Sequence, residues 1–199
     1  MKCWLVTAFG PFAGAQSNSS QIALEALRRK EWKGRVEFHG PVPVSFSGAW
    51  PDVLCALEQK PHVEGLLALG QAEGRERISL ERVALNWKDA RIADNAGAIP
   101  PQEPVEPGEA DVRWSSVPWE RLEPSPYWTR SYSAGTFVCN TLMYQSLGWA
   151  RAHGTRMAGF VHIPVLTSQN EAQFERTPRM SDDVAVAATA QLIEFVLEL

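Results

Sequence analysis

The sequence predicts a three-layer α/β/α sandwich built on a mostly parallel, partly mixed β-sheet. Apolar, strand-like runs alternate with helical patterns along most of the 199 residues, and this order is typical of parallel sheets. The run GLLALG at residues 65–70 is continuously apolar, as expected for a strand buried on both faces. Because 45% of the residues are hydrophobic, the chain can fill one sizeable core, and we expect a single domain over residues 1–199.

The individual elements follow from short patterns taken in order. Before the GLLALG strand we expect a strand at 4–9, a helix at 20–30, a strand ending near Val44 and a helix at 50–59. RISLERVALN at 77–86 predicts another strand, and MAGFVHIPV at 157–165 predicts a further buried one. Helices are expected at 140–153 and 182–199. Between 87 and 130 the prolines predict an extended loop region; they are Pro100, Pro101, Pro104, Pro107, Pro118, Pro124 and Pro126.

Charge and cysteine content exclude several classes of function. The formal net charge is −4 and no stretch gathers lysine and arginine, so we expect no nucleic-acid partner. The three cysteines are widely spaced, which favours neither a disulfide framework nor a metal site and fits reduced thiols in the cytoplasm. Gly10 and Pro11 interrupt the first apolar run, so we expect no secretory signal, and no segment is apolar enough to predict a membrane span.

A cysteine at the start of a predicted helix is the strongest chemical signal. In SAGTFVCN, residues 133–140, Cys139 falls just inside the first helical turn. The first N–H groups of a helix lack partners and carry partial positive charge, so a thiol there is expected to ionise more readily than a free one. The alternative is that Cys139 is a small buried apolar residue, as most cysteines are.

Several polar and aromatic side chains follow the predicted strands at one edge of the sheet. Phe9 and Phe12 flank the exit of the first strand, Gln71 follows GLLALG, and His162 lies late in GFVHIP. Ligands of open α/β sheets bind at this edge. His162 is either a satisfied core residue or the base that takes a proton from Cys139.

Glu81 lies among apolar residues in ISLERVALN, where an unpaired charge is costly. One interpretation is a carboxylate that orients the imidazole, which completes a nucleophile, base and acid. The alternative is a structural ion pair with Arg82, Arg77 or Arg91.

Five strings closely resemble the type I pyroglutamyl peptidases, a family of cysteine peptidases also called pyrrolidone carboxyl peptidases. They occur in the family's order over nearly the whole chain: LVTAFGPFAG, LGQAEGRERISLERVALN, DARIADNAG, SAGTFVCN and FVHIP.

The resemblance implies a cytoplasmic exopeptidase that needs no metal or cofactor. It implies that the enzyme removes N-terminal pyroglutamyl residues from peptides, with Cys139, His162 and Glu81 as catalytic residues. It further implies a substrate pocket in which Phe9 and Phe12 enclose the lactam ring, Gln71 forms part of the polar rim, and Asn18, Phe137 and Val138 also contribute. Arg91 is the implied contributor to oxyanion stabilisation. Many members of the family self-associate, so the resemblance also allows a homo-oligomer, either a dimer or a tetramer.

Four positions depart from the family pattern near the predicted site. Ala13 and Glu73 stand where glycine is common, while Ser19 and Thr167 stand where proline is common. Backbone strain is expected at Glu73 if that position needs a positive φ, and its charge could pair with Arg75 or Arg91. These changes leave open a catalytically silent homologue that only binds pyroglutamyl peptides or a partner subunit. Fold analogy alone also allows a phosphorylase of the nucleoside type.

Overall fold

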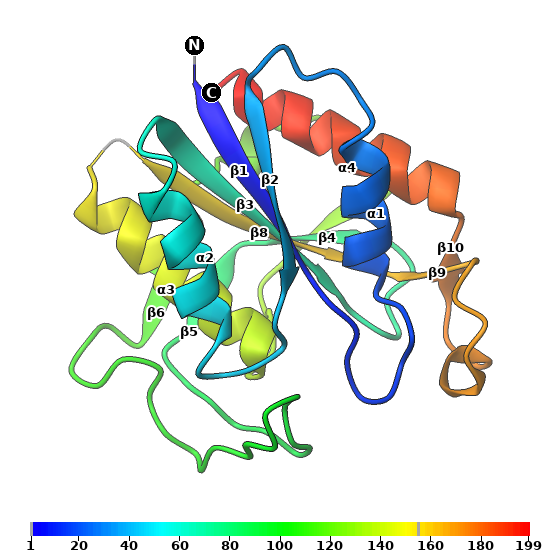
Figure 1. Cartoon of the computed structure of the whole chain (residues 1–199), viewed down its shortest axis with the longest axis horizontal. Helices are drawn as coiled ribbons and strands as arrows, with labels where there is room; N and C mark the ends of the chain where they lie inside the picture. Colours follow the sequence, from blue (N-terminus) through cyan, green and yellow to red (C-terminus); the bar gives the residue numbers. More distant parts are fainter. Residues whose placement is uncertain (1, 155) are drawn as a thin grey trace.

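The computed structural model describes residues 2–154 and 156–199 and has a six-stranded central sheet. Its strand order is β2-β1-β3-β8-β4-β7, and only the β8–β4 pair is antiparallel. This arrangement confirms the predicted mostly parallel, partly mixed sheet. The strands, shown in Figure 1, are β1 (Cys3–Phe9), β2 (Val36–Val42), β3 (Val63–Gln71), β4 (Ile78–Glu81), β7 (Trp128–Ser131) and β8 (Met157–Ile163).

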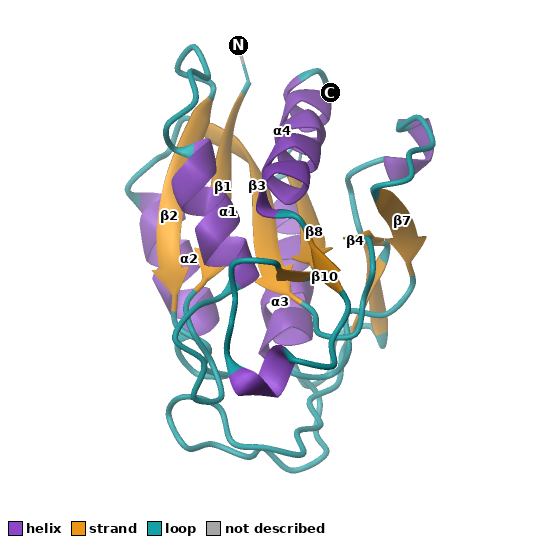
Figure 2. Ribbon diagram, turned by 90° about the vertical axis from the view of Figure 1, so that its right-hand side faces the viewer, coloured by secondary structure: helices purple, strands orange, loops and turns teal. Residues whose placement is uncertain are grey.

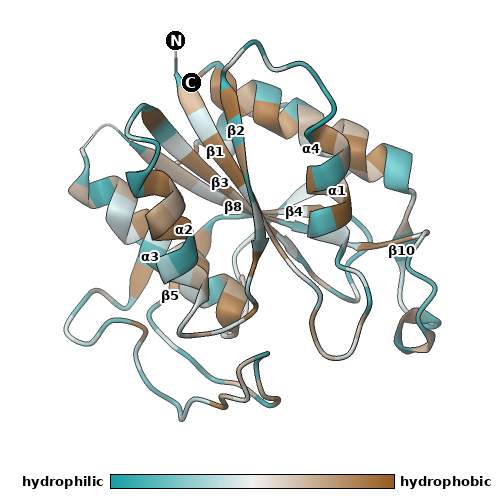
Figure 3. Ribbon diagram, viewed as in Figure 1, coloured by the Kyte–Doolittle hydropathy of each residue, from teal (hydrophilic) through white to brown (hydrophobic). Residues whose placement is uncertain are grey.

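Two pairs of helices cover the two faces of the sheet, which confirms the three-layer sandwich (Figures 1 and 2). Helices α2 (Ala49–Glu58) and α3 (Val138–Ala152) lie on one face, and α1 (Ser19–Leu27) and α4 (Asp182–Leu197) on the other. Side chains of β1 alternate between the two faces, as the strand period requires. Figure 3 shows apolar residues in the strands of the sheet and also along the helices, where they alternate with polar ones. In the described part of the chain, no helix is long and apolar enough to cross a membrane.

Two predicted strands are each divided in the structure. The expected strand at 77–86 breaks at Arg82, after which β5 (Val83–Leu85) leaves the main sheet and pairs with β6 (Val112–Trp114). The expected strand at 157–165 breaks at Pro164, which has no N–H to donate, and β9 (Val165–Leu166) pairs with β10 (Arg179–Met180).

The region predicted as extended loop holds more structure than expected. Residues 87–130 include β6, a 3-10 turn at Trp119–Arg121 and the first residues of the edge strand β7. These elements are only three or four residues long, so they leave no clear periodicity in the sequence.

The turn from β1 into α1 is fixed by Asn18, the N-cap residue of α1. Its Oδ1 accepts a hydrogen bond from the Ser20 N–H at 3.0 Å, and its Nδ2 donates to the Gly10 carbonyl at 2.9 Å. The side chain therefore ties the start of α1 to the end of β1.

Ala13, in this same turn, has a φ of 52°, in the left-handed region that disfavours side chains with a Cβ. Replacing Ala13 with glycine is expected to raise the free energy of unfolding by about 1 kcal/mol, because the strain exceeds the extra chain entropy of glycine. Urea denaturation measures the change. Ala15→Gly is the control: Ala15 is outside the left-handed region, so its replacement should lower stability. Equal effects of the two substitutions would contradict strain at Ala13.

Candidate active site

Cys139 is the second residue of α3, so the predicted position in the first helical turn is correct. The N-cap residue is Phe137, and no side chain caps this helix terminus. The first N–H groups of α3 therefore remain available to a ligand. The neighbouring Asn140 side chain is engaged elsewhere: it donates to the carbonyls of Leu85 and Trp87 and accepts from the Leu85 N–H, which anchors the helix start against β5.

Gly70 leaves the space that the sulfur of Cys139 occupies. A Cβ at Gly70 would lie 3.2 Å from Cys139 Sγ and 3.0 Å from the ring of Phe160. Gly70 is paired in register with His162 on the adjacent strand β8. The sulfur thus contacts the sheet next to His162, and Cys139 and His162 line the same cavity.

The imidazole of His162 is held by a buried carboxylate. His162 Nδ1 lies 2.8 Å from Oε1 of Glu81, whose side chain is fully buried. Arg75 donates to the same oxygen at 2.7 Å, so the carboxylate is ionised and can only accept hydrogen bonds. The proton of the neutral imidazole is therefore on Nδ1, and Nε2 carries the free lone pair. The arrangement supports the orienting role, with Arg75 as the ion-pair partner in place of Arg82, Arg77 or Arg91.

Burial keeps both members of the Cys139–His162 pair neutral at rest. Burial, together with the negative charge of Glu81, raises the pKa of the Cys139 thiol to about 12, with Arg75 acting in the opposite direction. Burial also lowers the pKa of His162 below 6.5, although the hydrogen bond and charge of Glu81 oppose the shift. The expectation of a readily ionised thiol is therefore wrong for the resting site, because burial outweighs the helix N-terminus.

The cavity has a volume of about 600 Å³ and one largely aromatic wall. Phe9, Phe12 and Phe137 line it, and the Phe137 ring lies 5.1 Å from that of Phe12 and 5.0 Å from that of Phe46. Gln71 and Asn18 also line the cavity, as expected. It combines an apolar surface with few polar groups, which suits a flat, uncharged ring.

Two residues expected at the site are placed elsewhere. The Val138 side chain is fully buried in the core between α3 and the sheet, so only its backbone faces the helix terminus. Arg91 is exposed on the loop after β5 and does not line the cavity. Among the cavity residues that were not predicted from the sequence, Ile92, Ala134 and Gly135 lie on irregular loops, and Gln173 lies in a short 3-10 helix at Ala172–Phe174.

The comparisons with known proteins agree with this geometry. A model of the pyroglutamyl peptidase family matches residues 1–198. The chain belongs to this family.

Curated relatives and solved structures extend the comparison. The pyrrolidone-carboxylate peptidase of Erwinia tasmaniensis is 40% identical over 85% of this chain and 81% of its own, and that of Vibrio parahaemolyticus is 36% identical over 100% and 94%. The crystal structure of Bacillus amyloliquefaciens pyroglutamyl peptidase I aligns with a TM-score of 0.84 at 32% identity, covering 95% of this chain and 93% of that one.

The departures from the pyroglutamyl peptidase pattern have different consequences. Glu73 lines the cavity, but the positive φ falls on the next residue, Gly74 (79°), so the expected strain at Glu73 is absent. Partial burial raises the pKa of Glu73. Arg75 is bound to Glu81 instead of Glu73, and among the described residues Glu73 has no ion pair. Glu73 therefore adds to the cavity a carboxyl group that has no ion-pair partner among the described residues.

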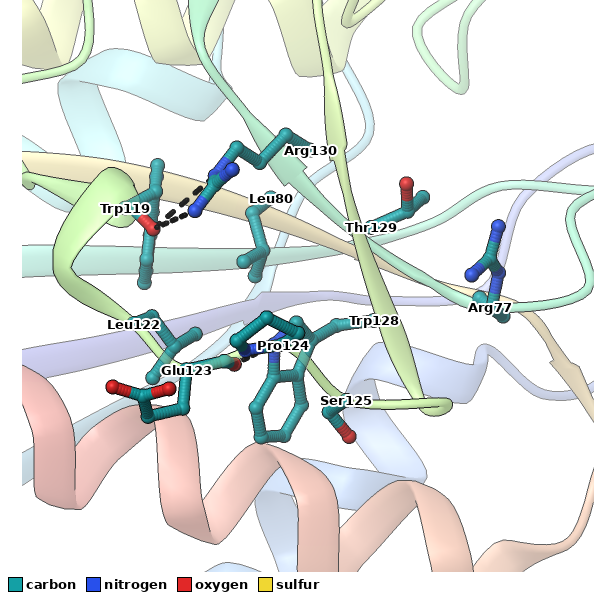
Figure 4. A pocket seen from close by; sticks show the side chains of 10 residues that line it. All are labelled: Arg77, Leu80, Trp119, Leu122, Glu123, Pro124, Ser125, Trp128, Thr129 and Arg130. Carbon is teal, nitrogen blue, oxygen red and sulfur yellow. Dashed lines mark hydrogen bonds between the residues drawn. The ribbon is translucent and has the colours of Figure 1, made fainter.

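A second hollow, drawn in Figure 4, lies on the other side of the sheet. Leu80 lines it, and this side chain faces the α1/α4 layer, whereas its neighbour Glu81 faces Cys139. The ten side chains of this hollow include no cysteine or histidine, so it offers no nucleophile and base of this type. Over residues 2–154 and 156–199, no three histidine, cysteine, aspartate or glutamate side chains are placed to hold a metal ion.

Gly70→Ala is expected to lower kcat about tenfold to a hundredfold, because the new methyl group displaces Sγ of Cys139 or the Phe160 ring beside His162. The measurement is kcat with a pyroglutamyl amide of a fluorescent amine. Gly159→Ala is the matched control on strand β8, because its Cβ would meet Val117 and Trp119 on the other face. That variant should lose stability and keep its kcat while folded. Wild-type kcat in Gly70→Ala would contradict the tight contact.

The acid limb of kcat/KM against pH is expected below 6.5, because His162 must be neutral to accept a proton and its pKa is lowered. Glu81 raises this pKa and Arg75 lowers it. Glu81→Gln should therefore move the limb to lower pH and Arg75→Gln to higher pH, whatever their effects on the plateau. If the acid limb moved in the same direction in both variants, the charges assigned to Glu81 and Arg75 around the imidazole would be wrong.

Proposed function

We propose that this chain is a cysteine exopeptidase that hydrolyses the peptide bond after an N-terminal pyroglutamyl residue. The supporting observation is the buried hydrogen bond between His162 Nδ1 and Glu81, which leaves Nε2 free in the cavity that Cys139 also lines. Membership of the pyroglutamyl peptidase family supports the substrate. The silent-homologue alternative has less support, because the three side chains and the aromatic pocket are all present.

In the first half of the reaction, the sulfur of Cys139 attacks the pyroglutamyl carbonyl carbon while Nε2 of His162 takes the thiol proton. Because the thiol is neutral at rest, proton transfer accompanies the attack. The carbonyl oxygen becomes an oxyanion, and the uncapped N–H groups at the start of α3 stabilise it. The imidazolium is stabilised by the carboxylate of Glu81. It then donates its proton to the departing amine as the C–N bond breaks.

The second half of the reaction releases pyroglutamate. The acyl group is now joined to Cys139 as a thioester, and the neutral His162 takes a proton from an incoming water molecule. The resulting hydroxide attacks the thioester carbon, the C–S bond breaks, and the proton returns to the sulfur. No other reactant is required.

The pocket suits the pyroglutamyl group because that group carries no charged amino terminus. Its lactam ring has two flat faces, one N–H donor and one carbonyl acceptor, which match an aromatic wall and the amide of Gln71. Proline has the same ring size and lacks the ring carbonyl. A buried polar group then loses its partner, at a cost of about 1–3 kcal/mol.

A cytoplasmic location is part of the proposal, since the cysteines Cys3, Cys55 and Cys139 are all free thiols. Self-association of the chain stays a prediction.

Cys139→Ala is expected to abolish release of a fluorescent amine from its pyroglutamyl conjugate under reducing conditions, because the nucleophile is lost. Cys55→Ala is the matched control: this free cysteine is exposed on α2, away from the cavity, and its loss should leave the rate unchanged. The prolyl conjugate should be cleaved far more slowly by the wild type, and added phosphate should have no effect.

If the wild type cleaves neither conjugate, the enzyme proposal is overturned in favour of the catalytically silent homologue that only binds pyroglutamyl peptides or a partner subunit. A requirement for phosphate would instead support the phosphorylase alternative.

A further inference from the structure

We propose that Gln169 is a positioning residue that fixes the direction of the Gln71 amide, so that Gln71 donates a hydrogen bond to the lactam carbonyl of the substrate. The inference rests on the proposed function and specifies how its pocket recognises the pyroglutamyl ring. Gln169 itself does not line the cavity and acts through Gln71.

The orientation of the Gln169 amide is set by a backbone group. Gln169 is 1% exposed, and its Oε1 accepts a hydrogen bond from the Leu166 N–H at 2.9 Å. A backbone N–H can only donate, so the oxygen of the amide must face it. The NH₂ group of Gln169 therefore faces the opposite way, where it donates to Oε1 of Gln71 at 2.9 Å.

A second donor meets the same oxygen of Gln71. The backbone N–H of Ser19 donates to Gln71 Oε1 at 2.7 Å. Two donors thus converge on this oxygen, and an amide turned by 180° would lose both bonds and place its NH₂ group against two donors. Gln71 lines the cavity, and within the described chain its Nε2 has no hydrogen-bond partner. The group that Gln71 offers to a ligand is therefore a donor, which pairs with a carbonyl.

Gln169 is held in place from the far side of the sheet. Its loop follows β9, and the Asp182 carboxylate in the first turn of α4 accepts hydrogen bonds from Thr167 Oγ1 at 2.9 Å and the Ser168 N–H at 3.0 Å. The negative charge of Asp182 is favourable at a helix N-terminus. The start of the loop, just before Gln169, is thus fixed both by the β9–β10 ladder and by α4.

Ser19 allows a clean removal of the second donor. It is the first residue of α1, a position at which proline is well tolerated, and proline has no N–H. Ser19→Ala keeps the N–H and loses only the hydroxyl, which donates to the Ile163 carbonyl at 3.2 Å. The difference between the proline and alanine variants therefore isolates the N–H donor.

The test compares Gln169→Leu combined with Ser19→Pro against Ser19→Pro alone, so that the two proteins differ only in the Gln169 donor. The double variant leaves Gln71 free to turn, and we expect its KM for a pyroglutamyl amide to exceed that of the single variant by about tenfold, with kcat changed by less than about twofold. Gln169→Leu combined with Ser19→Ala keeps the backbone donor of residue 19 and is the control. Gln169→Glu should raise KM further, because its carboxylate draws the NH₂ group of Gln71 away from the cavity. Discrimination against the prolyl conjugate should fall in parallel.

A second measurement does not require catalysis. Binding of free pyroglutamate, measured by calorimetry, should weaken by the same factor when Gln169→Leu is added to protein that carries Cys139→Ala and Ser19→Pro. Equal KM and equal binding in folded Ser19→Pro protein with and without Gln169→Leu would overturn the role of Gln169 while leaving the proposed function intact. If the wild type binds pyroglutamate and cleaves no pyroglutamyl conjugate, the proposed function alone is overturned. If it neither binds pyroglutamate nor cleaves the conjugate, both the proposed function and the role of Gln169 are overturned.

Discussion

The hydrogen bond between Glu81 and His162 is the interaction on which the candidate site depends, and it exists because β4 runs antiparallel to β8. In that pairing Glu81 lies opposite Phe160, which is two residues from His162 and on the same face of β8. The carboxylate therefore reaches the imidazole from the neighbouring strand without leaving the buried layer under α3. A fully buried charge is costly without partners, and Arg75 supplies the compensating positive charge from the loop after β3. The single antiparallel pairing of the sheet, between β4 and β8, thus brings the carboxylate to the proposed base.

Burial and the helix N-terminus act in opposite directions on Cys139. The terminus favours a thiolate, whereas burial and the nearby carboxylate favour the thiol, and the latter effects are larger. A neutral sulfur next to a neutral imidazole avoids holding an ion pair in the apolar pocket before substrate arrives. The uncapped N–H groups of α3 then meet negative charge only when the oxyanion forms. Their stabilisation is greater for the transition state than for the resting site, which is the condition for a gain in rate.

The sequence was sufficient to predict the layers of the fold and the residues Cys139, His162 and Glu81, because strong apolar periodicity and short motifs mark them. It did not offer Arg75 as a partner of Glu81 and named three other arginines instead, since a charge on a loop has no periodicity that sets its direction. The family resemblance implied that Val138 contributes to the pocket, but successive residues at a helix start point about 100° apart, which turns Val138 into the core. The strand β7 was missed because a four-residue edge strand in which three residues are polar leaves little pattern.

The two faces of the sheet contribute differently to the site. The α2/α3 face carries the sulfur, the imidazole and the carboxylate, while the α1/α4 face holds the groups that orient Gln71. Gln71 is the last residue of β3, and its side chain contacts both the start of α1 and the loop anchored to α4. An uncharged ligand offers no ion pair to set its direction in a pocket, so the direction must come from hydrogen bonds. Backbone N–H groups have a fixed polarity that no rotation can reverse, and here two of them, those of Leu166 and Ser19, fix the polarity of the side-chain amides between them and the cavity. As a result, the Gln71 NH₂ group is directed into the uncharged pocket, where it favours a ligand with a carbonyl oxygen at that place.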